Sequence, residues 1–353
     1  MRASQTDLRK PRSRNGAAAV TIRDVAARAG VSVATVSRVL NGKELVREET
    51  SAQVLEAARS LRYVPNVAAR SLSIRRTQTI GIVLPEVHGE FFSEVIRGID
   101  VAARHAGYHI LVSGSHSDVG EMMEVVDAMR GRVDGLVVMA PDIAVDSLRN
   151  QLPLVLLNSN DRRYDAITID NYGGARAMMR HLAGLGHTHI AFICGPKHNA
   201  DARERSRGYR QSMRGAKIIE MRGDFTEASG YAAAREIAAM DPRPTAIFAS
   251  NDSMAIGALG ALSEAGLSVP GDITVVGFDD IPIARYVAPP LTTVGVDIAE
   301  LGRRAFAVLL EVIAKPNARQ TRRDQIGTNL VVRKSCGAPP QPKRRSRTKG
   351  EES

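Results

Sequence analysis

From Thr79 onward, the sequence alternates short apolar runs with longer segments of helical periodicity. Because successive side chains of a strand point to opposite faces, an uninterrupted apolar run indicates a strand that is buried on both faces. Such strands form parallel sheets that helices cover on both sides. The predicted strands are Ile80–Leu84, His109–Ser113, Gly135–Met139, Leu154–Leu157, Ile167–Ile169, Ile190–Ile193, Ala246–Ala249 and Thr274–Phe278. The predicted helices between them include Phe92–His105, Ala175–Leu185, Glu227–Met240 and Asp252–Ala265.

Length and cysteine content narrow the class of protein. A chain of 353 residues is too long for one ordinary hydrophobic core, and its length predicts about two to three domains. Cys194 and Cys336 lie far apart in the sequence, so we expect neither a disulfide framework nor a cysteine-rich zinc site, and a reducing compartment is the default. The basic N-terminus lacks the apolar segment of a secretory signal, and no apolar run reaches the roughly 18 residues that span a bilayer. We therefore predict a cytoplasmic protein without a membrane partner.

The net charge of +10 is concentrated at the two ends of the chain. Residues 21–79 contain ten Arg or Lys against five Asp or Glu, and residues 333–353 contain seven against two, whereas residues 80–332 are mildly acidic. Basic ends on an acidic body predict a polyanionic partner for the ends. For the extreme tails, residues 1–19 and 337–353, we favour the alternative that they are solvated disorder.

The segment from Thr21 to Arg62 has the pattern of three short helices. Thr21 and Asp24 resemble a helix N-terminal capping box, and Gly30 can supply the positive φ of a tight turn. The apolar face of the first helix is predicted to be Ile22, Val25, Ala26 and Ala29. Ser32 caps a second helix that ends before Asn41-Gly42, with the inward stripe Val33, Val36, Val39 and Leu40. A third helix, from about Glu48 to Arg62, is expected to bury Val54, Leu55, Ala58 and Leu61, and the first two helices form a helix-turn-helix.

The second helix leaves Ala34, Thr35, Ser37 and Arg38 on its outer face. A helix in the major groove of DNA needs small residues at its tip for close approach and a long donor beside them. Ala34 can contact a thymine methyl group, and Arg38 can bond the edge of a guanine through two N–H groups. The alternative is a small three-helix packing unit with an exposed arginine.

The next stretch decides between a DNA-reading helix and a simple packing unit. Its sequence is Tyr63-Val64-Pro65-Asn66-Val67-Ala68-Ala69-Arg70-Ser71-Leu72. From Thr21 through "DVAARAGVSVATVSRVLNG" to "YVPNVAARSL", the sequence resembles the headpiece and hinge of the lactose/galactose repressor (LacI/GalR) family, and the resemblance continues to about residue 335. It implies a homodimer that binds a pseudo-palindromic operator in double-stranded DNA. The predicted DNA contacts are Thr21, Val33, Ala34, Thr35, Ser37, Arg38, Asn41, Tyr63, Asn66, Ala69, Arg70 and Leu72.

The hinge after Pro65 is too short to be a helix on its own in water, where about 12–15 residues are already marginal. It can therefore be helical on DNA and a coil off it. The resemblance implies that paired hinge helices enter the minor groove and that Leu72 wedges into a base step; the alternative is that Leu72 packs on the next domain. Arg47 is one departure from the family. Third helices in the family usually begin on Ser or Thr at this position, and an arginine side chain cannot cap the helix.

The body carries candidate ligand residues just after its strands, because parallel sheets bind ligands beyond their carboxyl ends. These candidates are Glu86, Phe91, Phe92, Asn158, Asn251, Asp252, Asp279 and Asp280, with Arg205 and Phe225 in the segments between. Aromatic planes beside fixed polar groups suit a sugar and suit a nucleobase nearly as well. Each candidate also has a structural alternative. Phe91 and Phe92 can belong to the core, Asp252 and Asp280 can cap helices or turns, and Arg205 can lie on a solvated face. We favour the core role for Phe92 and the capping role for Asp252 and Asp280.

The resemblance gives four of these residues an effector role, through "ERSRGY" for Arg205, "VGFDD" for Asp279, "ASND" for Asn251 and "GDF" for Phe225. It also implies a body of two α/β subdomains, like the type I periplasmic sugar-binding proteins, that close around a ligand. Asn158 stands where some sugar-responsive members carry Asp, so sugar preference does not transfer. The predicted effector-binding residues are Phe91, Phe92, Asn158, Arg205, Phe225, Asn251 and Asp279.

The predicted fold is an all-α helix-turn-helix headpiece followed by an α/β sensor of two doubly wound parallel-sheet subdomains. The predicted divisions are a disordered basic extension at 1–19, a DNA-binding domain at 20–64, a hinge helix and linker at 65–77, an effector-binding and dimerisation domain at 78–336, and a disordered basic tail at 337–353. Within that domain, one subdomain is predicted to hold 78–169 with 295–323, and the other 170–294 with 324–336.

Motifs for catalysis are not found in the sequence. His187 and His189 lie two residues apart before a strand without a plausible third metal ligand, so a satisfied loop histidine is favoured. Gly257 and Gly260 lie inside a predicted helix, where close packing explains them. The prediction is a transcriptional repressor without a metal or cofactor, controlled by a sugar or sugar derivative. The alternatives are a purine- or nucleoside-responsive repressor, a solute-binding protein that does not bind DNA, and an enzyme on the same scaffold.

Overall fold

The computed structural model describes residues 20–40, 46–63, 76–116, 118–139, 152–159, 161–315 and 321–340. The chain divides into two compact units, residues 1–76 and residues 77–353, and each is described by itself. Residues 1–19 and 341–353, which make up most of the two predicted tails, lie outside the described residues. So do five of the predicted DNA contacts: Asn41, Asn66, Ala69, Arg70 and Leu72.

Within its described residues, the first unit contains three helices, α1 (Ile22–Ala29), α2 (Val33–Leu40) and α3 (Glu48–Ser60). The predicted capping box is confirmed, because the Asp24 carboxylate accepts hydrogen bonds from the Thr21 amide at 2.7 Å and the Thr21 hydroxyl at 2.8 Å. Gly30 ends α1 in the left-handed region, with a φ of 63°. These local signals produce the predicted helix-turn-helix, and the buried core of the unit is Val25, Ala26, Val36, Val54, Ala57 and Ala58.

Two predictions for the headpiece core were wrong. Val33 and Leu55 are 41% and 42% exposed, although both were assigned to inward stripes. Val33 is the first residue of α2, whose buried residue is Val36. On α3 the buried residues are Val54, Ala57 and Ala58, so Ala57 takes the inward position that was assigned to Leu55. Arg47 does precede α3 without a side-chain capping bond, as predicted.

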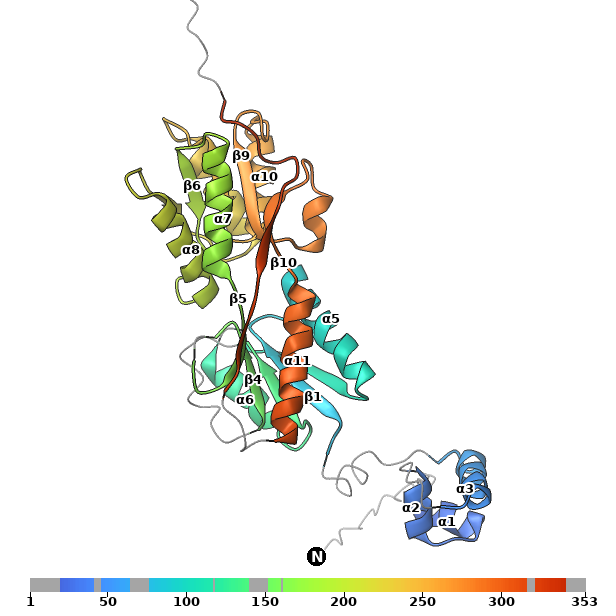
Figure 1. Ribbon diagram of the computed structural model, residues 1–353. Helices are drawn as coiled ribbons and strands as arrows, with labels where there is room; N and C mark the ends of the chain where they lie inside the picture. Colours follow the sequence, from blue (N-terminus) through green and yellow to red (C-terminus); the bar gives the residue numbers. More distant parts are fainter. Residues whose placement is uncertain are drawn as a thin grey trace, which may run out of the picture. The chain divides into compact units, whose positions relative to one another are not determined.

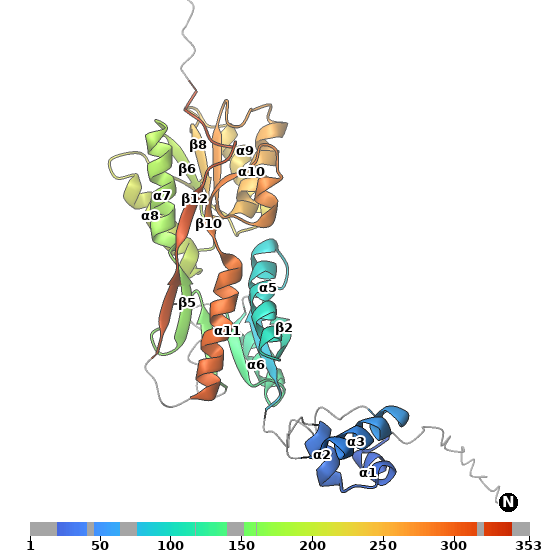
Figure 2. The same ribbon diagram turned by 45° about the vertical axis from the view of Figure 1, so that its right-hand side comes forward.

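The second unit is built on two six-stranded sheets in the described part of the chain. The first sheet defines the N lobe, and its strand order is β11-β5-β4-β3-β1-β2. Its strands are β1 (Thr79–Leu84), β2 (His109–Gly114), β3 (Gly135–Val138), β4 (Leu154–Leu157), β5 (Asp165–Ile169) and β11 (Arg323–Ile326). Its helices are α5 (Glu90–His105), α6 (Val119–Met129) and α11 (Ile298–Ala314). Figures 1 and 2 show α5 and α11 side by side over this sheet.

The second sheet defines the C lobe, with the strand order β12-β10-β9-β8-β6-β7. Its strands are β6 (Ile190–Ile193), β7 (Ile219–Met221), β8 (Ala246–Ala249), β9 (Thr274–Asp279), β10 (Thr292–Val296) and β12 (Thr328–Val331). Its helices are α7 (Asn171–Gly184), α8 (Ala200–Ser212), α9 (Glu227–Ala238), α10 (Asp252–Glu264) and the short 3₁₀ helix η2 (Pro282–Arg285). All neighbouring strands are parallel except β10 and β12. The predicted class of two parallel-sheet subdomains is therefore confirmed.

The chain crosses between the lobes three times, at Asp170, at Asp297 and at Gly327 (Figure 2). The second and third crossings come two to three residues later than the predicted boundaries at 294/295 and 323/324. Gly295 and Val296 still pair with β12 in the C lobe, and residues 324–326 still pair with β5 in the N lobe. Hydrogen bonding of each strand to its own sheet, rather than the end of the apolar run, decides where the chain leaves a lobe.

One pair of helices in each lobe crosses at glycines. In the N lobe, a Cβ on Gly98 of α5 would lie 2.0 Å from the carbonyl oxygen of Ala299 on α11. In the C lobe, a Cβ on Gly257 of α10 would lie 1.9 Å from the carbonyl oxygen of Glu227 on α9. The predicted close packing is thus confirmed for Gly257. It is wrong for Gly260, whose added Cβ would meet only the Tyr231 ring at 3.9 Å.

No described helix is long and apolar enough to cross a membrane.

Candidate effector cleft and DNA-reading helix

Helix α2 presents the predicted DNA-reading residues on its outer face. Ala34 and Arg38 are exposed, and Thr35 and Ser37 are half-buried. Ser32 caps the helix, because its hydroxyl oxygen accepts from the Thr35 amide at 3.1 Å and lies 2.9 Å from the Thr35 hydroxyl. The exposed guanidinium of Arg38 beside a small alanine is the arrangement that a major-groove helix requires. Tyr63, in contrast, packs against the headpiece core, and its DNA contact stays a prediction.

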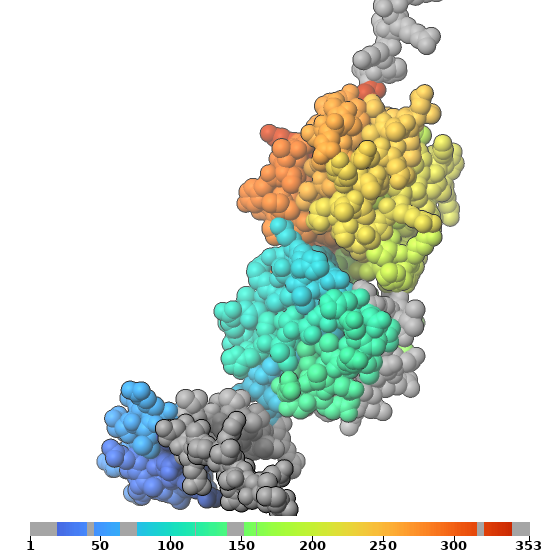
Figure 3. Space-filling model, turned by 180° about the vertical axis from the view of Figure 1, so that it is seen from behind, coloured from blue at the N-terminus to red at the C-terminus, as the bar shows by residue number. Residues whose placement is uncertain are grey.

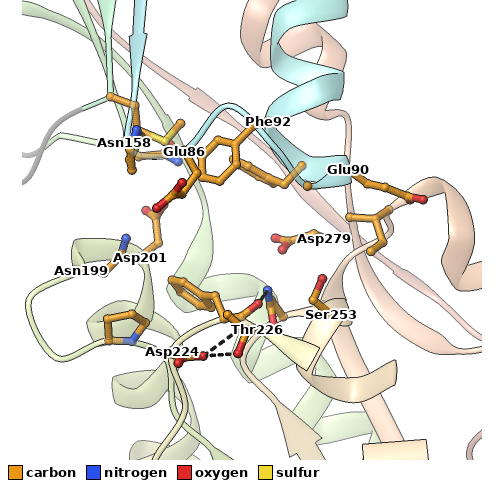
Figure 4. Close-up of a pocket in the computed structure, with 18 of the residues that line it drawn as sticks. Glu86, Glu90, Phe92, Asn158, Asn199, Asp201, Asp224, Thr226, Ser253 and Asp279 are labelled. Atoms are coloured by element: carbon orange, nitrogen blue, oxygen red, sulfur yellow. Dashed lines mark hydrogen bonds between the residues drawn. The ribbon is translucent and has the colours of Figure 1, made fainter. Parts of the chain in front are cut away.

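A cavity of about 340 Å³ lies between the two lobes, beyond the carboxyl ends of their strands. We call it the effector cavity. All seven residues predicted to bind effector line it, together with Glu86, Glu90, Asp201, Asp224, Thr226 and Ser253 (Figure 4). Figure 3 shows the two lobes meeting along one boundary on the far face of the body. The structure therefore brings together residues that are separated by almost 190 positions in the sequence; their role as effector ligands stays a prediction.

Arg205 forms the centre of the cavity wall in the C lobe. Its side chain is 3% exposed, and its Nη2 lies 2.9 Å from Oδ1 of Asp279. Its other nitrogens donate to Oδ1 of Asn171 at 2.7 Å and to the carbonyl of Ser250 at 2.6 Å. The guanidinium also stacks over the Phe278 ring at 3.8 Å. Arg205 is thus a buried structural element of the site, and the alternative of a solvated face is wrong.

Burial raises the pKa of Asp279 to about 6, and the neighbouring Arg205 opposes that rise. The carboxyl is therefore ionised at pH 7.5, so its pair with Arg205 is an ion pair there. Because the positive charge of Arg205 is already matched, the cavity offers a ligand little net attraction for an anion at this position. Asp279 contributes acceptor oxygens instead.

Behind this pair lies Asp252, which is fully buried. Its oxygens accept from the Thr293 hydroxyl at 2.5 Å and from the Ile281 amide at 3.0 Å, so it ties α10 to β10 and to the segment before η2. Burial raises its pKa well above the usual range, and the nearby Asp279 raises it further. Asp252 is not the cap of α10, since Oδ1 of Asn251 accepts from the Met254 amide. Asp280 is likewise no cap, and pairs with Arg333 at 2.6 Å.

Replacing Asp252 with Asn should raise the thermal unfolding temperature of the full chain at pH 7.5. The pKa of Asp252 is higher in the folded chain than in the unfolded chain, so the folded chain binds the proton more tightly and the carboxyl costs stability above its unfolded pKa. That cost falls as the pH is lowered, so the advantage of Asn should shrink at pH 5. Scanning calorimetry at the two pH values measures the difference.

Asp161 provides a control of opposite sign. Hydrogen bonds from Arg163 lower its pKa to about 2, so its carboxylate stabilises the fold above the unfolded pKa. Asp161→Asn should therefore lower the unfolding temperature at pH 7.5. An Asp252→Asn protein that is equally destabilised at both pH values would contradict the assignment of a costly buried carboxyl.

Three cavity residues have backbone conformations that L residues rarely adopt. The φ angles are 53° for Asn158, 75° for Phe225 and 114° for Asp279. Positive φ values cost free energy and cluster at functional sites, where the surrounding structure enforces them. Here they aim an amide, an aromatic ring and a carboxylate at one cavity. This signal was invisible in the sequence, because none of the three is glycine.

The cavity wall combines aromatic rings with acidic side chains, and both lobes contribute to each kind. Phe91 and Phe92 begin α5 and meet edge to face at 5.5 Å, and Phe225 from the C lobe rests on Gly195, where a Cβ would come within 2.5 Å of its ring. Both phenylalanines of α5 are half-buried and line the cavity, and both also pack against the hydrophobic core, so the core role favoured for Phe92 does not exclude a place in the cavity. The acidic residues are Glu86, Glu90, Asp201, Asp224, Glu227 and Asp279. Rings with exposed faces beside many acceptors suit a ligand that is rich in hydroxyl or N–H donors.

The lobes also touch at the mouth of the cavity. Glu90 at the start of α5 accepts a hydrogen bond from the Ile283 amide of η2 at 2.8 Å. This bond joins the two aromatic residues of α5 to the segment that follows Asp279. Sequence reasoning missed Glu90, and it also missed Asp201 and Asp224, which lie in loops and first helical turns after β6 and β7 rather than directly behind a predicted strand.

His187 confirms the prediction of a satisfied loop histidine. Its ring nitrogens lie 2.8 Å from the Thr245 hydroxyl and 2.8 Å from the Gly337 carbonyl. In the described ranges, no three His, Cys, Asp or Glu side chains are grouped as metal ligands.

Comparison with known proteins matches both parts of this architecture. Residues 21–66 match the model of "Bacterial regulatory proteins, lacI family", and residues 179–336 match a periplasmic binding protein-like domain. The transcriptional repressor PurR of Haemophilus influenzae (strain PittEE) is 34% identical over 329 residues, which span 89% of this chain and 98% of PurR. The chain belongs to the LacI family.

Two further LacI-family proteins extend the comparison. The ribose operon repressor of Escherichia coli (strain K12) is 36% identical over 315 residues, covering 86% of this chain and 96% of that protein. The crystal structure of the Lac repressor dimer bound to operator and the anti-inducer ONPF superposes with a TM-score of 0.83 at 32% identity, over 91% of this chain and all of that one. The resemblance inferred from the headpiece and hinge motifs is thereby confirmed, as is the headpiece-plus-sensor fold.

Proposed function

We propose that this protein is a transcriptional repressor that binds operator DNA through α2 and is controlled by a small molecule bound between its lobes. The observation that carries this proposal is that a helix-turn-helix with exposed Ala34 and Arg38 is fused to a body whose seven predicted effector residues line one cavity. Its relatives include the transcriptional repressor PurR and the ribose operon repressor. A non-DNA-binding solute carrier would have no use for such a headpiece.

The protein acts as a homodimer in the cytoplasm. Two-fold symmetry of the protein matches a pseudo-palindromic operator, in which each headpiece contacts one half-site. The Lac repressor structure that superposes on this chain is a dimer on its operator. No catalytic role, cofactor or metal is proposed, because the buried carboxylates of Asp279 in the cavity and of Asp252 behind it are engaged in structural bonds.

The effector is a sugar or sugar derivative, and a purine or nucleoside is the second candidate. Phenylalanine rings from both lobes can stack on the apolar face of either ring system. The carboxylates around them accept bonds from hydroxyl groups or from ring N–H groups. Closure around the effector shifts operator affinity only to the extent that the effector binds the two states differently, typically by about 1–3 kcal/mol.

Replacing Arg38 with Ala should weaken binding to the preferred operator by about 1–3 kcal/mol, roughly 5- to 150-fold, because a bidentate contact to a guanine edge is lost. The operator is first selected from random duplexes with the wild-type chain, and affinities are then measured by fluorescence anisotropy at fixed salt. Binding to unrelated DNA should change far less, so the specificity ratio falls.

Arg59→Ala on α3 is the matched control, since it removes the same charge from an exposed position outside α2. It should alter specific and non-specific binding equally. If the wild-type chain selects no sequence, or if Arg38→Ala and Arg59→Ala behave alike, the proposed DNA-reading role of α2 is wrong.

A further inference from the structure

A second cavity, of about 310 Å³, lies beside the crossing segments that join the lobes. Its walls include Asp170, Asn171 and Tyr172 from the first crossing, Glu204 and Arg207 from α8, and Gln325 from β11. Residues of both lobes and of two crossings therefore meet in it, as they do in the effector cavity. Neither the sequence motifs nor the proposed function assigns it a role.

The second cavity adjoins the effector cavity. Asn158, Ala200 and Asp201 line both cavities. The two cavities are therefore neighbours with a common wall. Asp201 and Asn158 appear on the same side of the effector cavity in Figure 4, at the end away from Ser253. The shared wall thus lies at one end of the effector cavity rather than at its centre.

A hydrogen-bonded chain also connects the two cavities. Asp279 pairs with Arg205 in the effector cavity, and Arg205 donates to Oδ1 of Asn171, which lines the second cavity. The Asn171 amide nitrogen then donates to Oδ1 of Asp201 at 2.7 Å, in the shared wall. A group bound at Asp201 is therefore linked to Arg205 through one side chain.

Asn158 marks the boundary as a ligand position. Its side chain is 91% buried, given an exposure of 9%, yet neither Oδ1 nor Nδ2 has a hydrogen-bond partner in the described structure. Leaving a buried polar group without a partner costs about 1–3 kcal/mol. The residue also has a positive φ. The Asn158 amide is therefore suited to donate a hydrogen bond to, and accept one from, a ligand that extends from one cavity into the other.

The two cavities differ in chemistry. Both cavities are lined by carboxylates, but the phenylalanine rings line only the effector cavity; the carboxylates around the second cavity are those of Asp170, Asp201 and Glu204. Its one arginine, Arg207, is paired with Glu204 and stacks on Tyr172 at 4.3 Å, so its charge and the ring face are both engaged. Because Arg207 balances Glu204, the carboxylates of Asp170 and Asp201 decide the charge of this surface, which favours hydroxyl donors and repels phosphate.

We propose that the second cavity is a subsite of the effector site, and that the effector is an uncharged glycoside. One ring lies among the phenylalanines, the glycosidic bond passes Asn158, and the hydroxyl groups of the second ring bind Asp201 and its neighbours. A disaccharide and a nucleoside share this chemistry. The inference rests on the proposed function in that it assumes the interlobe cleft binds the effector.

The test compares one-ring and two-ring compounds on the full chain by isothermal titration calorimetry. The pairs are glucose with cellobiose and maltose, galactose with lactose, and adenine and ribose with adenosine; glucose 6-phosphate and AMP are the charged counterparts. One glycoside should bind at least about ten-fold more tightly than each of its parts, and the phosphorylated compounds should bind more weakly still. The disaccharide and nucleoside arms identify the class.

A filling variant tests the subsite itself. Gln325→Trp adds bulk to an exposed residue of β11 that lines only the second cavity. It should remove the ten-fold advantage of the glycoside and leave one-ring binding unchanged. Asn329→Trp, on exposed β12 and outside both cavities, is the control that should change neither.

Equal affinities for ring and glycoside, equal losses of both in Gln325→Trp, or no binding by any glycoside would each overturn the inference. Operator selection by the same protein is measured in parallel. If the operator is bound but no glycoside is preferred, the subsite fails and the repressor function stands; if no operator is selected, the proposed function fails.

Discussion

Arg205→Met is expected to lower the free energy of unfolding of the full chain by about 3–5 kcal/mol and to abolish its response to effector. Methionine keeps the apolar stem of the side chain but leaves the Asp279 carboxyl buried without its cation. The Asn171 side chain and the Ser250 carbonyl also lose their donor. Urea unfolding measures the first effect, and operator release by the identified effector measures the second.

Arg210→Met is the control on the same helix. Arg210 pairs with Glu220 at 2.7 Å, but its side chain is 57% exposed, and surface pairs contribute about 0–1 kcal/mol. A double variant, Arg205→Met with Asp279→Asn, should recover part of the lost stability, because no buried charge remains unpaired. Should Arg205→Met lose no more stability than Arg210→Met, the buried pair does not hold the cleft together as described.

Two substitutions of the same kind in α10 should have opposite signs. Gly257→Ala places a Cβ 1.9 Å from the Glu227 carbonyl, so α9 and α10 must separate, and we expect a loss of about 2–3 kcal/mol. Gly260→Ala meets only a ring atom at 3.9 Å, so it should gain about 0.5–1 kcal/mol, the helical preference of alanine over glycine. Urea unfolding of both proteins gives the comparison directly.

The glycine pair separates packing from helix propensity. Both positions lie in one helix, so any general effect of alanine on α10 appears in both variants. Destabilisation of similar size at Gly257 and Gly260 would mean that the close crossing of α9 and α10 is not the reason for glycine at 257.

Periodicity and local chemistry predict much of this fold. The continuous apolar runs became the central strands of both sheets, and the Thr21–Asp24 box and Gly30 did set the limits of α1. Three of the missed strands, β7, β11 and β12, are short and lie at edges, whereas β10 is an inner, fully buried strand that was also missed. β11 reads Arg-Asp-Gln-Ile and carries no apolar run, because an edge strand faces solvent and is positioned by its pairing with β5. Such pairing between distant segments leaves no local pattern.

The candidate site was predictable in its residue types but not in its bonding. Strand ends and family motifs pointed to Arg205, Phe225 and Asp279, which do line one cavity. They gave no indication that Asn251 uses its oxygen to cap α10 and its amide to bond Phe225. They also could not show that Asn158 is buried without a partner, since both facts depend on how two lobes and three crossings come together.

The three crossings bear on how the chain folds as it is synthesised. The N-lobe sheet lacks its edge strand β11 until residue 326 is made, and the C-lobe sheet lacks β12 until residue 331. Until then, β5 and β10 have unpaired edges, which are templates for association with other chains. The headpiece, in contrast, is complete by Tyr63. A nascent chain therefore carries a folded helix-turn-helix well before it has a sensor, and the two lobes receive their last strands almost together, at residues 326 and 331.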